Sequence, residues 1–192
     1  MTPENQSLDS DFFLIHQPLT LFRITKTKFA NLSGVGAALV PSRWNRSGEE
    51  AIYTSTEVGT CGLEMLAHTH KAMIPSDLAL MGIRISGQWE AQKNALIDSR
   101  TSACFWFYRS LAEANKAFEG PAHFFAGGVN LFAGVVNPFA VAVPSVIVPA
   151  WNVVLYPGGI GFWDHVSLES VEAYQFDPRL FPEDTPEEDI FI

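Results

Sequence analysis

Runs of apolar residues bounded by proline, glycine and polar residues predict several short strands along this chain. The segment 19–25 alternates apolar and polar positions, whereas 78–85 is almost continuously apolar. A later apolar run is interrupted by Pro144, which removes a backbone donor from any strand there. The predicted strands cover residues 19–25, 51–54, 78–85, 141–148, 153–155 and 166–176, the last as a strand pair or a single strand.

A helix is predicted over residues 57–71. Thr54 and Glu57 have the spacing of a capping box, in which two side chains satisfy free backbone N–H groups. Within the helix Glu64 and His68 share a polar face, because residues four apart are neighbours. The predicted buried stripe comprises Val58, Gly62, Met65 and Leu66.

Residues 99–119 predict a second helix, whose aromatic cluster 105–108 is expected to be buried or at an interface. Strands and helices do not alternate regularly along the chain, so a doubly wound parallel fold is not indicated. We therefore predict a single α+β domain with central mixed or antiparallel strands and flanking helices.

Length and composition support one globular domain with a sizeable core, since 47% of the 192 residues are hydrophobic and 17% charged. Residues 1–18 are expected to form a polar leader unlike a signal peptide. Residues 19–181 are expected to form the domain, and 182–192 an acidic tail. The tail carries five acidic residues, so the net charge of −9 is concentrated there.

The same composition excludes several classes of function. An acidic chain without a basic stripe is not expected to bind nucleic acid directly. Prolines interrupt the apolar run 137–155, which argues against a membrane helix. Cys61 and Cys104 form neither a disulfide framework nor a zinc pattern, so a reduced, cytoplasmic setting is expected. Glu64, His68 and His70 lack a metal-binding spacing, and no metal is predicted.

Arg43, Trp44 and Asn45 follow a loop rich in glycine and place a cation, a stacking surface and an amide at one spot. They are either ligand contacts or a loop in which Trp44 fills the core and Arg43 is solvated, and both interpretations stay open. Arg23, taken alone, is more typical of an edge strand with a solvated guanidinium. Alternatively, its rigid fork of donors would suit a phosphate.

Three further residues carry candidate chemistry. Tyr53 is typical of a core aromatic, or could stack on a planar heterocycle. Glu64, taken alone, is typical of a solvated helix carboxylate, although a carboxylate near a sugar would stabilise an oxocarbenium-like transition state. Ser145 lacks a nucleophile elbow, so it is either a core serine or a ligand contact.

Taken in order along the chain, these residues resemble the RES domain family, the toxin halves of RES–Xre toxin–antitoxin pairs. Residues 99–138 do not match the family pattern and resemble a variable insertion. The matching positions are 21–24, 42–45, 48, 52–55, 63–64, 143–145, 149, 152 and 176–180.

The resemblance implies a fold similar to that of ADP-ribosyltransferases and NAD as the substrate. By that resemblance Arg23 and Arg43 hold the phosphates and ribose of NAD, and Tyr53 packs near the nicotinamide. Glu64 is implied as the catalytic carboxylate, with Arg43 beside it, and Ser145 as a ligand contact. Trp44 and Asn45 complete the implied NAD-binding set.

The function expected from this resemblance is cleavage of the nicotinamide–ribose bond of NAD, with water or phosphate as acceptor. Two alternatives remain: ADP-ribosyl transfer to a protein, and a non-enzymatic module that binds an Xre-type partner. The implied partner is a helix-turn-helix antitoxin of the Xre family. The many aromatic residues also favour a homodimer within a larger complex.

Overall fold

The computed structural model describes residues 18–69, 75–92, 95–101, 103–108, 110–119 and 138–181. The expected leader, apart from Pro18, and the expected acidic tail 182–192 lie outside these ranges. Most of the C-terminal half of the expected insertion, residues 120–137, also lies outside them.

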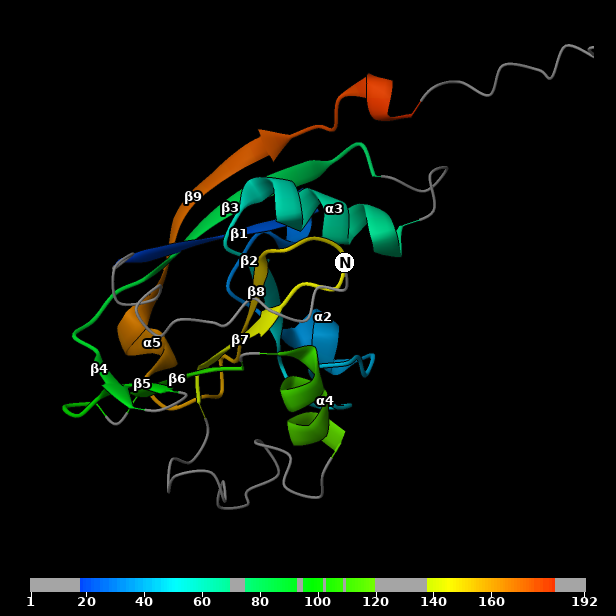
Figure 1. Ribbon diagram of the computed structural model, residues 1–192. Helices are drawn as coiled ribbons and strands as arrows, with labels where there is room; N and C mark the ends of the chain where they lie inside the picture. Colours follow the sequence, from blue (N-terminus) through cyan, green and yellow to red (C-terminus); the bar gives the residue numbers. More distant parts are fainter. Residues whose placement is uncertain are drawn as a thin grey trace, which may run out of the picture.

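A mixed nine-stranded sheet in the order β4-β5-β6-β7-β8-β2-β1-β3-β9 organises the described residues (Figure 1). Its neighbouring strands are antiparallel except for the parallel pair β6–β7. The α+β class with mixed strands is thus confirmed. The strands are β1 (Leu19–Lys26), β2 (Ile52–Ser55), β3 (Leu78–Ile85), β4 (Glu90–Gln92), β5 (Ala95–Asp98), β6 (Ala103–Phe107), β7 (Ala140–Pro144), β8 (Trp151–Leu155) and β9 (Val166–Tyr174).

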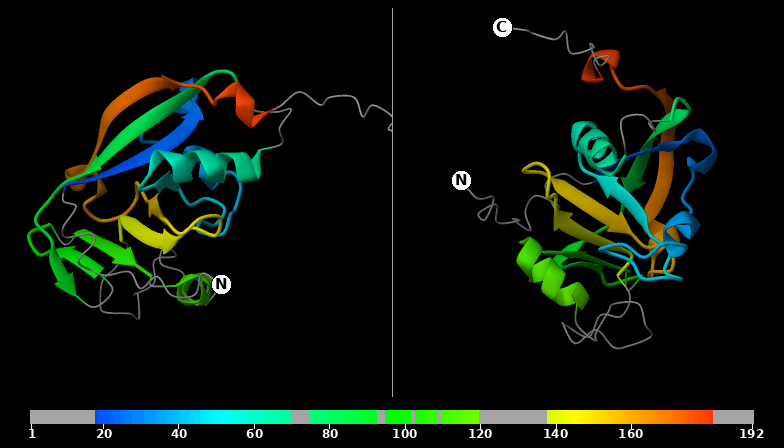
Figure 2. Two further views of the ribbon diagram at one scale, coloured as in Figure 1. Left: turned by 45° about the horizontal axis from the view of Figure 1, so that its top comes forward. Right: turned by 90° about the vertical axis from the view of Figure 1, so that its right-hand side faces the viewer.

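Short helices flank the sheet. Helix α3 contacts β1 and β2, α4 contacts β7, and α5 contacts β9, as Figures 1 and 2 show. None of the helices in the described ranges has both the length and the apolar character needed to cross a membrane. The helices are α2 (Val35–Ala38), α3 (Val58–His68), α4 (Leu111–Glu119) and α5 (Phe162–His165), with 3₁₀ turns η1 (Thr27–Phe29) and η3 (Pro178–Leu180).

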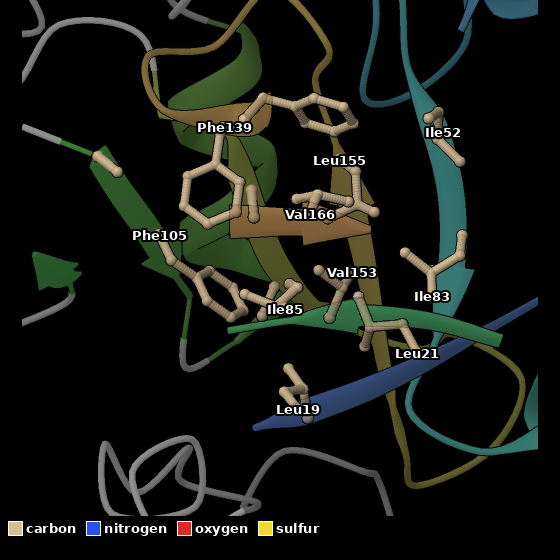
Figure 3. Close-up of a cluster of buried hydrophobic side chains, with 14 of the residues drawn as sticks. Leu19, Leu21, Ile52, Ile83, Ile85, Phe105, Phe139, Val153, Leu155 and Val166 are labelled. Atoms are coloured by element: carbon tan, nitrogen blue, oxygen red, sulfur yellow. The ribbon is translucent and has the colours of Figure 1, made fainter. Parts of the chain in front are cut away.

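Alternation along the strands divides the buried side chains between the two faces of the sheet. In β8, Val153 and Leu155 enter the largest core cluster, whereas Val154 between them enters a second cluster. Figure 3 shows the largest cluster, in which Leu21 of β1 and Ile83 of β3 approach the side chains of β8. Both faces of the central strands are therefore covered.

The prediction of one helix over 99–119 is wrong. The segment forms strand β6 followed, after a short connection, by helix α4. All five residues of β6 are buried, because its side chains alternate between the two core clusters on the two faces of the sheet. A strand buried on both faces has no alternation to distinguish it from a buried helix, which explains the error. The expectation that residues 105–108 are buried is confirmed.

The helix predicted at 57–71 forms as α3, but its predicted capping box does not. Thr54 lies in β2 and its hydroxyl donates to the Val153 carbonyl at 2.5 Å. Glu57 occupies the N-cap without a side-chain cap. The fully buried positions of α3 are Thr60, Cys61 and Gly62, while the other predicted stripe residues are half-buried.

Candidate active site

A cavity of about 500 Å³ opens where β1 and β2 part from each other. The two strands are paired at Phe22 and Ser55. The next residues of β1, 23–25, line the cavity together with Tyr53 and Thr54 of β2. A break in the middle of the sheet thereby exposes strand residues that would otherwise face a neighbouring strand.

The parting of β1 and β2 is stabilised by α3. The backbone N–H of Ile24 donates to the Cys61 sulfur at 3.1 Å, so this donor is satisfied without a bond to β2. Gly62 lets the helix approach closely, since an added Cβ would lie 3.3 Å from the Phe176 ring. Burial raises the pKa of the Cys61 thiol to about 11, so this sulfur is a neutral part of the cavity wall.

Arg23 brings a cation to the cavity that nothing in the described part of the chain neutralises. The residue is half-buried, but its Nη1 atom is fully buried and has no hydrogen-bond partner there. Burial lowers the pKa of Arg23, because desolvation penalises the charged form. Even so, guanidinium stays protonated in proteins. Arg23 itself lines the cavity, so its positive charge would attract an anionic ligand there.

Arg43 and Trp44 form the rim on another side. Arg43 is exposed, and its guanidinium carbon lies 5.8 Å from the centre of the Trp44 ring. Trp44 is 7% exposed and belongs to the second core cluster, while part of it also lines the cavity. Its carbonyl accepts a bond from the Tyr156 hydroxyl at 2.8 Å. Trp44 therefore fills the core, as one interpretation of the sequence proposed, and also lines the cavity, as a ligand contact would.

Asn45 is not brought to the cavity wall. Its side-chain nitrogen donates to the carbonyls of Ala37 and Arg46 at 2.8 and 3.1 Å, and its oxygen accepts from the Tyr53 hydroxyl at 2.7 Å. The amide thus holds the loop that carries Arg43. Tyr53 lines the cavity, and burial raises the pKa of its hydroxyl.

Glu64 projects from α3 into the cavity, and one of its two carboxylate oxygens is held by the protein. Its Oε1 accepts from the Ser145 hydroxyl at 2.7 Å and from the Asn152 side-chain nitrogen at 2.5 Å. Ser145 is buried behind Glu64 and does not itself line the cavity. Ser145 is thus a hydrogen-bond partner of Glu64, a contact that the order of the sequence motifs did not indicate.

Sequence reasoning missed Asn152 and Ser55 as site residues. The Ser55 hydroxyl donates to the Asn152 side-chain oxygen at 2.6 Å, and both residues line the cavity. They lie opposite each other in the β2–β8 pairing. Both fall within the family pattern, but nothing in their residue type signals a role, so only the register of two distant strands reveals it.

The assembled cavity offers cations, an aromatic ring and one oriented carboxylate. Such a set suits an anionic ligand that contains a sugar and a planar ring. His68 of α3 and Leu111 of α4 complete parts of the wall. In the described ranges no three His, Cys, Asp or Glu side chains gather as a metal site would require.

The motifs that form this cavity lie within a region, residues 20–177, that matches the RES domain family. The chain belongs to the RES domain family. This RES protein is 28% identical over 165 residues to a curated protein named Toxin Res from Photorhabdus laumondii subsp. laumondii. The alignment covers 84% of this chain and 97% of that protein.

A solved structure is similar to this RES protein in fold. A chain of the crystal structure of the M. tuberculosis MbcT–MbcA toxin–antitoxin complex matches it with a TM-score of 0.50 and 17% sequence identity. The match covers 85% of this chain and 86% of the other. At that identity the likeness concerns the fold alone.

Proposed function

We propose that this RES protein cleaves the bond between nicotinamide and ribose in NAD, and that it is the toxin of a toxin–antitoxin pair. The observation that carries the proposal is the convergence on one cavity of Glu64 and Arg23, whose Nη1 has no hydrogen-bond partner among the described residues. NAD needs both kinds of group, since it carries a pyrophosphate and, at the reacting end, a ribose. The proposed catalytic domain spans residues 19–181.

In this mechanism the two arginines bind the phosphates and ribose of NAD, and Glu64 acts on the ribose next to the nicotinamide. Arg23 holds a phosphate from the cavity wall, and Arg43 contacts the phosphates or ribose from the rim, beside the reacting centre. Tyr53 packs near the nicotinamide. Trp44 shapes the rim, and Asn45 supports it indirectly through the loop.

The bond that breaks joins the ribose carbon to the nicotinamide ring nitrogen, and its electron pair goes to that nitrogen. Nicotinamide leaves uncharged, so no general acid is needed. The positive charge that develops on the ribose is stabilised by the Glu64 carboxylate, which also accepts from the ribose hydroxyls. Water or inorganic phosphate then attacks the ribose carbon.

The toxin role is supported by the name of the curated relative and by the toxin–antitoxin complex that shares the fold. By the family resemblance, the partner is an Xre-type helix-turn-helix antitoxin that blocks the cavity. In this proposal the protein acts in the cytoplasm, where it lowers NAD and arrests growth, and it forms a homodimer within the larger complex.

Nicotinamide release from NAD tests the proposal directly, at several phosphate concentrations. Wild type is expected to release nicotinamide, and Glu64→Gln to lose at least about 10²-fold in rate, because a neutral amide cannot stabilise the developing charge. Glu57→Gln is the matched control, since Glu57 lies exposed at the start of the same helix, outside the cavity lining.

Equal inactivity of wild type and Glu64→Gln at every phosphate concentration would contradict the proposal. Mass spectrometry of lysate proteins distinguishes the neighbouring chemistry. A single protein carrying ADP-ribose, with the NAD pool intact, would indicate transfer rather than NAD breakdown. Unchanged growth arrest in Glu64→Gln would instead favour a non-enzymatic module.

A further inference from the structure

We infer that Asn152, Ser55 and Ser145 are positioning residues that fix the Glu64 carboxylate, so that one oxygen is held by the protein and the other is left for the substrate. This inference rests on the proposed function. It assigns Asn152 and Ser55 a role, and it makes Ser145 act through Glu64 rather than on NAD.

The hydroxyl of Ser145 is directed at Glu64 by the backbone. Its oxygen accepts from the N–H groups of Ile147 and Val148 at 3.1 and 3.4 Å. Those bonds occupy the lone pairs of the hydroxyl and leave its hydrogen as the group available to Glu64 Oε1, 2.7 Å away. The turn between β7 and β8 therefore sets the direction of this donor.

The carboxamide of Asn152 is oriented by Ser55. A side-chain amide can turn over and exchange its oxygen with its nitrogen, which would place an acceptor against the Glu64 carboxylate. The Ser55 hydroxyl donates to the Asn152 oxygen at 2.6 Å and so favours the orientation in which the nitrogen faces Glu64. Ser55 is 3% exposed, so solvent does not compete effectively for this hydroxyl.

Both donors converge on the same oxygen of Glu64. Oε1 accepts from Ser145 and from Asn152, whereas Oε2 has no hydrogen-bond partner among the described residues. A carboxylate held through one oxygen cannot rotate freely about its terminal bond. Oε2 is thereby available for a ribose hydroxyl and for the developing positive charge.

Positioning predicts a fall in kcat with little change in KM. Displacing a reacting group by about 1 Å can cost on the order of 10²-fold in rate, whereas NAD binding rests mainly on the arginines. We expect Asn152→Ala and Ser55→Ala each to lower kcat by about 10- to 100-fold, with KM within about threefold of wild type. Ser55→Thr keeps the hydroxyl and is expected to retain most of the wild-type kcat.

The experiment measures kcat and KM for NAD in purified wild type and these three variants, with Thr56→Ala as matched control. The Thr56 hydroxyl also bonds across to β8, at the Trp151 carbonyl, but it has no link to Glu64. Thr56→Ala is therefore expected to keep the wild-type kcat. Thermal unfolding of each variant checks that it is folded.

The possible outcomes separate this inference from the proposed function. An active wild type with unimpaired Asn152→Ala and Ser55→Ala variants would overturn the positioning role and leave NAD cleavage standing. The same holds if Ser55→Thr is as impaired as Ser55→Ala, or if the loss appears in KM alone. A wild type that releases no nicotinamide would remove the proposed function, and this inference with it.

Discussion

Replacing Arg23 by methionine should make this RES protein more stable and less able to bind NAD. Nη1 of Arg23 is buried without a hydrogen-bond partner in the described chain. A buried polar group left unsatisfied costs about 1–3 kcal/mol, and more when it is charged. Methionine preserves much of the stem of the side chain and removes that cost. We therefore expect the free energy of unfolding to rise by at least about 1 kcal/mol, or about 2–4 °C in Tm for a chain of this size.

The Arg23→Met variant should bind NAD more weakly, because it lacks the charged hydrogen-bond donor of the arginine. A hydrogen bond to a charged group is worth about 1.5–3 kcal/mol, so NAD affinity is expected to fall about 10- to 150-fold. Urea unfolding gives the stability, and calorimetry in the Glu64→Gln background gives the NAD affinity without turnover. Lys26→Met is the control, because Lys26 is an exposed cation in the same strand. A variant Arg23→Met that is less stable than Lys26→Met would refute the reasoning.

Three further predictions concern the fold around the cavity. Gly159→Ala should lower the free energy of unfolding by about 1–3 kcal/mol, because the new Cβ would collide with the main chain that enters β7. Gly158 has open space around it, so Gly158→Ala should change the free energy of unfolding little in the same urea titration. The buried Cys61 thiol has a pKa of about 11, above its ordinary 9.0, so its contribution to the free energy of unfolding is present below pH 9 and is lost as pH rises toward 11. Between these two values we expect the free energy of unfolding to fall by about 1.4 kcal/mol per pH unit, and Cys61→Ala to reduce that slope. Tyr53→Phe should cost about 1–3 kcal/mol by leaving the buried Asn45 oxygen without its donor, and an unchanged unfolding midpoint would show that this bond does not hold the loop.

Local patterns determined the parts of this protein that depend on neighbours along the chain. Strand β3 was predicted at its observed bounds, because its eight-residue apolar run is short for a helix and is bounded by polar residues at both ends. Helix α3 was predicted from the helical spacing of its apolar positions, although the capping box predicted for it does not form. The order of the motifs around Arg23, Arg43 and Glu64 was enough to indicate the family, which the match over residues 20–177 then showed.

Tertiary structure decided what the local pattern could not. Strand β6 was mistaken for a helix because burial on both faces erases the alternation that identifies a strand. Asn45, expected at the ligand, instead holds a loop, since its partners are carbonyls and a hydroxyl that the fold brings to it.

The surroundings of Glu64 show the difference most clearly. The sequence indicated the carboxylate, but its donors Ser145 and Asn152 lie 81 and 88 residues further along the chain. Their approach depends on the β2–β8 register and on the turn after β7. The sequence gives the identity of each side chain, whereas the hydrogen-bond partners of Glu64 are fixed only when distant strands pair. The sequence could therefore indicate Glu64 but not the residues that hold it.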